Sequence, residues 1–147
     1  MKTLLALLLW LIIGSFGSLS AQNTIYLTAQ PTDMGLGVRY DRQIGDLGLY
    51  GSLAKGHYKL EDGSYIDDHY KVSLGGLAYI PEHFGFVSFG ISYHHYGSYY
   101  FYEPRSGNVM TPISCEGGVG TWFGKVSVAF RMDIIKWESM VELGIKF

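Results

Sequence analysis

The sequence predicts an all-β fold, an antiparallel up-and-down barrel of eight strands. Apolar residues recur at every second position along nearly the whole chain, which is the period of a strand. The composition agrees, because Gly 20, Tyr 12 and Phe 8 accompany only 16% charged residues. Glycine and aromatic residues disfavour helices and suit strands and tight turns. Short connections also alternate with longer or more polar ones.

Residues 1–21 are predicted to lie outside the fold. Lys2 precedes an unbroken apolar run from Leu4 to Ile13, and small, weakly polar residues follow as far as Ala21. This is the three-part layout of a secretory signal peptide. A bilayer span needs about 20 apolar residues, so the run is too short to cross one. We expect cleavage after Ala21, or at Ser20 as a second choice, which leaves residues 22–147 as one domain; an uncleaved anchor helix is the alternative.

The final strand shows the alternation most clearly. Its apolar residues are Val141, Leu143, Ile145 and Phe147, and between them lie Glu142, Gly144 and Lys146. The same period predicts seven further strands, within residues 25–30, 36–41, 47–53, 71–80, 87–94, 113–123 and 126–134.

The connections also follow a pattern. Short ones are expected at 43–46, 81–83 and 124–125, and longer or more polar ones at 31–34, 59–69, 99–110 and 135–139. If the first strand runs outward, all the short connections fall at one end of the barrel. Short periplasmic turns and longer extracellular loops are typical of barrels in the bacterial outer membrane.

The two faces of the strands differ in charge. The face rich in glycine and serine also carries four basic and four acidic residues, which are Arg39, Asp41, Lys71, Glu116, Arg131, Asp133, Glu142 and Lys146. A soluble barrel points its apolar face inward and fills the lumen with bulky residues. We predict the reverse, with these eight charges plugging the lumen and small residues such as Gly75 and Gly118 making room for them.

Three features favour a transmembrane barrel over a soluble one. The apolar face continues along all eight predicted strands, the chain carries an export signal, and the last strand is apolar up to Phe147. In lipid every backbone donor and acceptor must be paired within the protein, so strands cross only as a closed barrel. The alternative is a soluble barrel whose polar face is simply wetted.

Residues 24–147 resemble the small eight-stranded outer-membrane proteins of Gram-negative bacteria. The strand count, the alternation of connections and the terminal strand carry the resemblance. Phe147, with Val141, Leu143 and Ile145 before it, looks like the signal that the barrel-assembly machinery reads. The resemblance implies an outer-membrane location, with membrane lipid and that machinery as partners. It says almost nothing about activity, because one fold hosts many functions.

Two histidines and a serine are weak catalytic candidates, namely His94, His95 and Ser98. Lipid A deacylases, which are small barrels, place His-x-Ser on one face of one strand. Here Ser98 lies three residues after His95 and four after His94. His95 and Ser98 therefore point to opposite faces, and no acidic partner is evident. We expect no catalysis.

The remaining candidates favour no metal, cofactor or nucleic acid. The five histidines are scattered, and the segment from Asp67 to His69 is typical of a solvated loop tip. A net charge of −2 offers no basic surface for nucleic acid. The aromatic run Tyr93, Tyr96, Tyr99, Tyr100, Phe101 and Tyr102 indicates an interfacial girdle, with an adhesive surface as the alternative. Cys115, the only cysteine, shares the apolar face with Ile113.

Together these features predict a non-enzymatic monomer of the outer membrane with a structural or surface-interaction role. Two alternatives stay open. One is a lipid-modifying barrel enzyme of the lipid A deacylase or acyltransferase type. The other is a secreted soluble β-barrel that binds a small apolar ligand.

Overall fold

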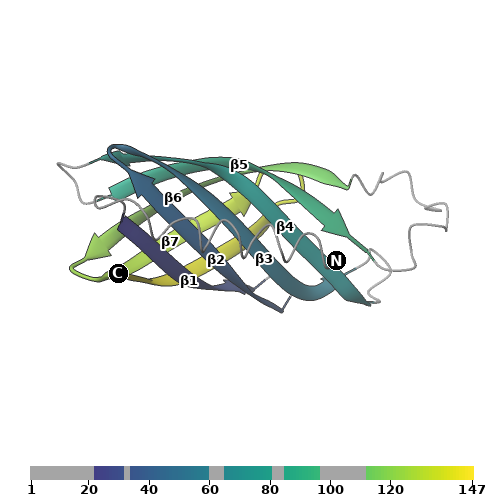
Figure 1. Cartoon of the computed structure of the whole chain (residues 1–147). Helices are drawn as coiled ribbons and strands as arrows, with labels where there is room; N and C mark the ends of the chain where they lie inside the picture. Colours follow the sequence, from purple (N-terminus) through teal and green to yellow (C-terminus); the bar gives the residue numbers. More distant parts are fainter. Residues whose placement is uncertain (1–21, 32–33, 60–64, 81–84, 97–111) are drawn as a thin grey trace, which may run out of the picture.

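The fold is a closed, eight-stranded antiparallel barrel, as predicted (Figure 1). The computed structural model describes residues 22–31, 34–59, 65–80, 85–96 and 112–147. The predicted leader, residues 1–21, and the whole of the predicted connections at 81–83 and 99–110 lie outside the described residues. The strands are β1 (Gln22–Gln30), β2 (Gly35–Ile44), β3 (Leu47–Lys59), β4 (Tyr65–Ile80), β5 (Gly85–His95), β6 (Ile113–Phe123), β7 (Val126–Asp133) and β8 (Glu138–Lys146).

Pairing between β1 and β8 closes the barrel. Thr24 pairs with Lys146, and the register continues to Ala29 opposite Val141. Beyond the ladder, the Phe147 amide donates to the Asn23 carbonyl at 2.9 Å, and the Asn23 amide donates to the Phe147 carbonyl at 3.2 Å. Closure gives every strand two neighbours, so none presents a free edge for pairing with another chain.

The two ends of the barrel are named here by residues that mark them. The Phe147 end carries the two-residue connections Gly45-Asp46 and Gly124-Lys125, where Gly45 and Gly124 adopt positive φ angles of 63° and 66°. A positive φ is a conformation that glycine adopts at little cost. The Trp137 end carries the turn from β7 to β8, where the Asp133 carboxylate accepts from the backbone amides of Ile135 and Lys136 at 3.2 and 3.0 Å.

Three predicted connections are partly strand, and in the shortest of them β2 continues to Ile44, inside the expected connection 43–46. The segment 59–69 was expected to be a loop, but β3 reaches Lys59 and β4 already starts at Tyr65. Lys59 pairs with Tyr65, and the register between the two strands shifts between Gly56 and Tyr58. Likewise β8 starts at Glu138, inside the expected connection 135–139. Acidic residues indicate loops only weakly, because strand propensity yields to pairing with a neighbouring strand.

The outward face is apolar and exposed, which confirms the predicted division of the faces. Leu36 is 74% exposed, Phe123 69% and Leu27 68%, whereas the inward neighbour Tyr26 is fully buried. Cys115 lies on the outward side with Ile113, and it is half-buried. Within the described part of the chain, no helix is long and apolar enough to cross a membrane.

The inward face holds more than charges and small residues. Near the Phe147 end it carries an aromatic cluster, defined by Tyr26, Tyr79, Phe86 and Trp122. The centroid of the Trp122 ring lies 5.1 Å from that of Tyr79, on which it stacks, and 5.0 Å from that of Phe86. The inward glycines make room both for charged side chains and for aromatic rings. A side chain at Gly118 would meet Arg131, as expected, but one at Gly75 would meet the Tyr50 ring.

Candidate functional site

The middle of the lumen and its Trp137 end hold a buried polar network. Seven of the eight predicted lumen charges are at most 2% exposed, the exception being Lys146. Lys146 is half-buried and places its Nζ 5.3 Å from the centroid of the Trp122 ring. Glu138, which fell in a predicted connection, is a further lumen carboxylate and is 3% exposed.

Five of these residues form a central group, which consists of Arg39, Asp41, Glu116, Arg131 and Glu142. Glu142 joins its two arginines: one carboxylate oxygen lies 2.6 Å from Arg39 Nη1, and the other lies 2.7 Å from Arg131 Nη2. Arg39 also binds Asp41 through two nitrogens, at 2.6 and 2.9 Å. Arg131 Nη1 binds Glu116. The group spans the lumen, since its members come from β2, β6, β7 and β8.

Neutral side chains occupy further positions around these charges. Thr28 donates to Glu142 at 3.0 Å. Glu116 accepts from the Tyr50 hydroxyl at 2.8 Å and from Ser73 at 3.0 Å. The Arg39 guanidinium also lies 4.4 Å from the Tyr50 ring centroid. A buried ion pair offsets its desolvation cost only when geometry and additional hydrogen bonds are good, and this group has both.

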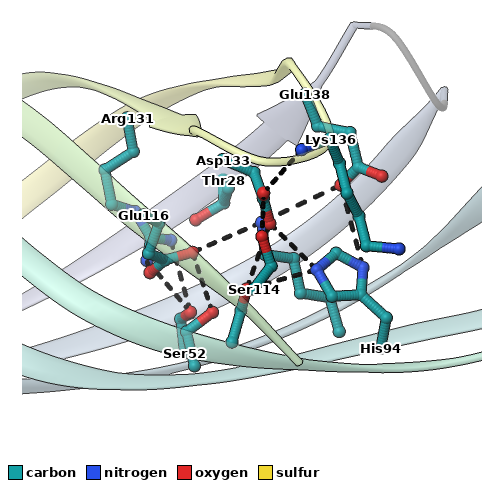
Figure 2. Close-up of polar contacts among 12 residues, drawn as sticks. Thr28, Ser52, His94, Ser114, Glu116, Arg131, Asp133, Lys136 and Glu138 are labelled. Carbon is teal, nitrogen blue, oxygen red and sulfur yellow. Dashed lines mark hydrogen bonds and ion pairs between the residues drawn. The ribbon is translucent and has the colours of Figure 1, made fainter. Parts of the chain in front are cut away.

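A second set, the histidine group, lies nearer the Trp137 end and consists of His69, Lys71, His94, Asp133 and Glu138. Lys71 links it to the central group, because its Nζ lies 3.3 Å from Glu116, 3.2 Å from Asp133 and 3.8 Å from Glu138. Figure 2 shows members of the two groups, with Arg131 and Glu116 on one side and Asp133, His94 and Glu138 on the other.

His94 is held from both ring nitrogens. Its Nε2 lies 2.9 Å from Asp133 Oδ2, and its Nδ1 lies 3.0 Å from His69 Nε2. Ser92 and Ser114 both donate to the Asp133 carboxylate, Ser92 at 3.1 Å. The Tyr96 ring stacks on His69 with centroids 5.0 Å apart and an interplanar angle of 5°. These contacts fix the positions of both imidazoles.

The catalytic candidates from the sequence separate in the structure. His94 is buried in the lumen and His95 is exposed on the outer face, while Ser98 lies outside the described residues. Asp133 is the acidic partner of His94 that the sequence did not reveal, because it comes from β7, two strands away. Ser92 lies 3.2 Å from His94 Nε2, the same nitrogen that contacts Asp133. A serine-hydrolase triad uses opposite ring nitrogens for serine and acid, so this arrangement differs from a triad.

Two assignments from the sequence are wrong. His69 was placed in a solvated loop tip and is 1% exposed inside the barrel, next to His94. Tyr96 was placed in an outward girdle and is fully buried in the lumen, although Tyr93 does face outward at 48% exposure. Extending the alternation of β4 backward from Lys71 would have placed His69 inside, since both share one face.

Comparison with protein-family models found no match to this chain, and comparison with curated proteins found none either. The function is therefore argued from the geometry of the barrel and its lumen.

Proposed function

We propose that this protein is a Gram-negative outer-membrane barrel without catalytic activity, and that its role is structural or one of surface interaction. The observation that carries the proposal is the inverted distribution of side chains. Leucine, isoleucine, valine and phenylalanine cover the outside of the barrel, whereas arginines, lysine and carboxylates lie at 0–3% exposure inside it.

The outer surface supports a lipid environment. Exposed apolar side chains occur on all eight strands, for example Leu27 on β1, Leu49 on β3 and Ile91 on β5, at 68%, 61% and 58% exposure. Soluble monomers rarely expose contiguous apolar patches beyond a few hundred Å². A bilayer would cover this belt, and the closed hydrogen-bond ladder meets the requirement that no backbone group be left unpaired in lipid.

The contents of the lumen favour a barrel whose interior is plugged by side chains over one that holds a ligand site or a pore. Eight strands leave an interior just wide enough for side chains to fill. Here the buried aromatic cluster lies toward the Phe147 end, and the buried central and histidine groups lie in the middle and toward the Trp137 end. A pocket for a small apolar ligand is lined mainly by apolar and aromatic groups, so the buried charges argue against the soluble ligand-binding alternative.

A lipid-modifying enzyme is disfavoured by the geometry around His94. Its Nε2 already contacts both Ser92 and Asp133, its Nδ1 contacts His69, and the ring is fully buried. In the proposed orientation the Phe147 end faces the periplasm and the Trp137 end faces outward. Lipid surrounds the barrel, and the barrel-assembly machinery inserts it.

Cys115 supplies the test, because it is the only cysteine and lies on the outward face. In a membrane it should react with a membrane-soluble maleimide and resist a charged one in intact membranes. A matched control is Ser114→Cys in a Cys115→Ser background, which places the thiol inside the lumen, where Ser114 is 1% exposed.

The control thiol should react with neither reagent until the barrel is unfolded. Rapid reaction of Cys115 with the charged maleimide would place the outer face in water and support the soluble alternative. Fractionation of the cells, followed by a gel that compares boiled and unboiled protein, gives an independent measure of whether a folded barrel is in the membrane.

A further inference from the structure

We propose that His69, His94 and Glu138 form a binding site for one divalent transition-metal ion inside the barrel. One candidate ligand atom from each of the three side chains lies within 4.8 Å of the others, and all three side chains are buried. They come from β4, β5 and β8, so only the closed barrel brings them together. The proposal goes beyond the function proposed above and does not depend on what surrounds the barrel.

The two imidazole nitrogens are hydrogen-bonded to each other at the separation of neighbouring metal ligands, so metal binding requires the proton on His69 Nε2 to move to His69 Nδ1. His69 Nε2 and His94 Nδ1 are 3.0 Å apart. Metal–imidazole bonds of about 2.0–2.1 Å place two such nitrogens about 2.8–3.4 Å apart for bond angles between roughly 90° and 110°. Glu138 Oε2 lies 3.9 Å from His94 Nδ1. Movement of this flexible side chain toward the two nitrogens would complete a three-ligand set.

Asp133 orients His94 for this role. The Asp133 carboxylate only accepts hydrogen bonds, so its 2.9 Å contact places a proton on His94 Nε2. In the neutral ring, Nδ1 then carries the lone pair, and Nδ1 is the atom that faces His69 and Glu138. Carboxylate–histidine pairs of this kind are the usual outer support of a metal-binding imidazole. Tyr96, stacked on His69, restricts the second ring.

The charge of the lumen favours a divalent cation. Among the buried residues of the described chain, three are cationic, namely Arg39, Lys71 and Arg131, and five are carboxylates, namely Asp41, Glu116, Asp133, Glu138 and Glu142. An excess of two negative charges remains when both histidines are neutral. Lys136 lies half-buried near Tyr96, with its Nζ 4.5 Å from the ring centroid. One of these two excess charges belongs to the histidine group, where Lys71 faces Asp133 and Glu138, and a divalent ion bound there would cancel the excess of the lumen as a whole.

The ligand set selects the class of metal. Two imidazoles and one carboxylate suit zinc, copper, nickel or ferrous iron. Calcium and magnesium prefer sites made of oxygen. Three protein ligands would leave a fourth position for water, as in zinc sites that are not purely structural.

The test uses purified, refolded full-length protein that has been treated with a chelator. Titration calorimetry with Zn²⁺ should give one site per chain, and Co²⁺ should develop d–d absorption bands. With Cu²⁺, electron paramagnetic resonance should show coupling to two imidazole nitrogens. Mg²⁺ at the same concentrations should not compete.

Variants then assign the ligands. His69→Gln and Glu138→Gln should each weaken Zn²⁺ binding at least tenfold, and Asp133→Asn should weaken it about 10–100-fold as an outer-sphere partner. The control is His95→Gln, which changes the adjacent histidine on the exposed face. Heat-modifiable migration checks that each variant is folded. Absence of Zn²⁺ binding to the folded wild type would overturn the proposal, as would equal binding by the wild type and a folded His69→Gln or Glu138→Gln.

Discussion

The two halves of the lumen fill the same barrel in different ways. Toward the Phe147 end, the aromatic cluster of Tyr26, Tyr79, Phe86 and Trp122 fills space with rings that contact each other at 5–6.4 Å between centroids. Toward the Trp137 end, charged side chains fill it and are fixed by hydrogen bonds. The first half depends on volume, whereas the second depends on the partners of each charge.

This difference predicts different sensitivities. Ring packing is short-ranged and not strongly directional, so the aromatic half should respond chiefly to changes in size. In the polar half one residue serves several partners, as Glu142 serves Arg39, Arg131 and Thr28. Removing a charge there, even without a change of size, leaves its partners buried and incompletely paired.

The largest effect is expected from Glu142→Gln, which keeps the shape of the side chain and removes its charge. Arg39 and Arg131 would both lose a carboxylate partner, so the free energy of unfolding should fall by about 3–5 kcal/mol. Urea titration in lipid vesicles, followed by tryptophan fluorescence, measures it.

The matched control for that variant is Asp68→Asn, which removes the charge from an exposed pair. Lys55 Nζ lies 3.5 Å from Asp68 Oδ1, and the two side chains are 56% and 69% exposed. An exposed pair contributes about 0–1 kcal/mol, so the control should change stability little. Equal small effects of both substitutions would indicate that water reaches the central group.

A smaller effect is expected from Gly120→Ala in the aromatic half. A methyl group at this inward position would meet the Phe86 ring and would lie 2.9 Å from Ala129 Cβ. Overpacking of this kind costs about 1–3 kcal/mol, measured by the same titration.

Gly117→Ala is the control on the same strand, because its nearest neighbours would lie 3.8 Å from the added carbon. It should change stability by less than about 0.5 kcal/mol. A Gly120 variant as stable as the Gly117 variant would mean that the aromatic cluster is loosely packed and that the comparison between the two halves does not hold.

Much of the fold could be predicted from the sequence, because alternation states directly which side chains share a face. It placed Leu27, Leu143 and Cys115 outside and Arg39 and Glu142 inside, as the structure has them. It did not find the full length of β3 and β4, whose pairing beyond Gly56 depends on contacts between strands. The prediction also overlooked Tyr26 and Tyr79 as residues that fill the lumen, because it sorted the inward residues by polarity and not by side-chain volume.

Seven of the eight predicted charges belong to the buried network, but their pairing was not predicted. A period of two says that Arg131 and Asp133 share a face, but it cannot say which strand lies across the lumen. Arg131 binds Glu142 of the neighbouring β8, whereas Asp133 contacts His94 of β5, two strands away. His69 and Glu138 were missed because acidic neighbours and a predicted turn suggested loops. Such contacts across the lumen follow from closure of the barrel and its diameter.

The most direct test of the closed lumen is planar-bilayer recording with purified, refolded wild-type protein. The aromatic cluster and the two polar groups together predict no steady conductance at any salt concentration, while a refolded general porin in the same bilayer gives normal steps. Reproducible single-channel steps from the wild type that grow with salt concentration would contradict the closed lumen and make a pore the preferred function.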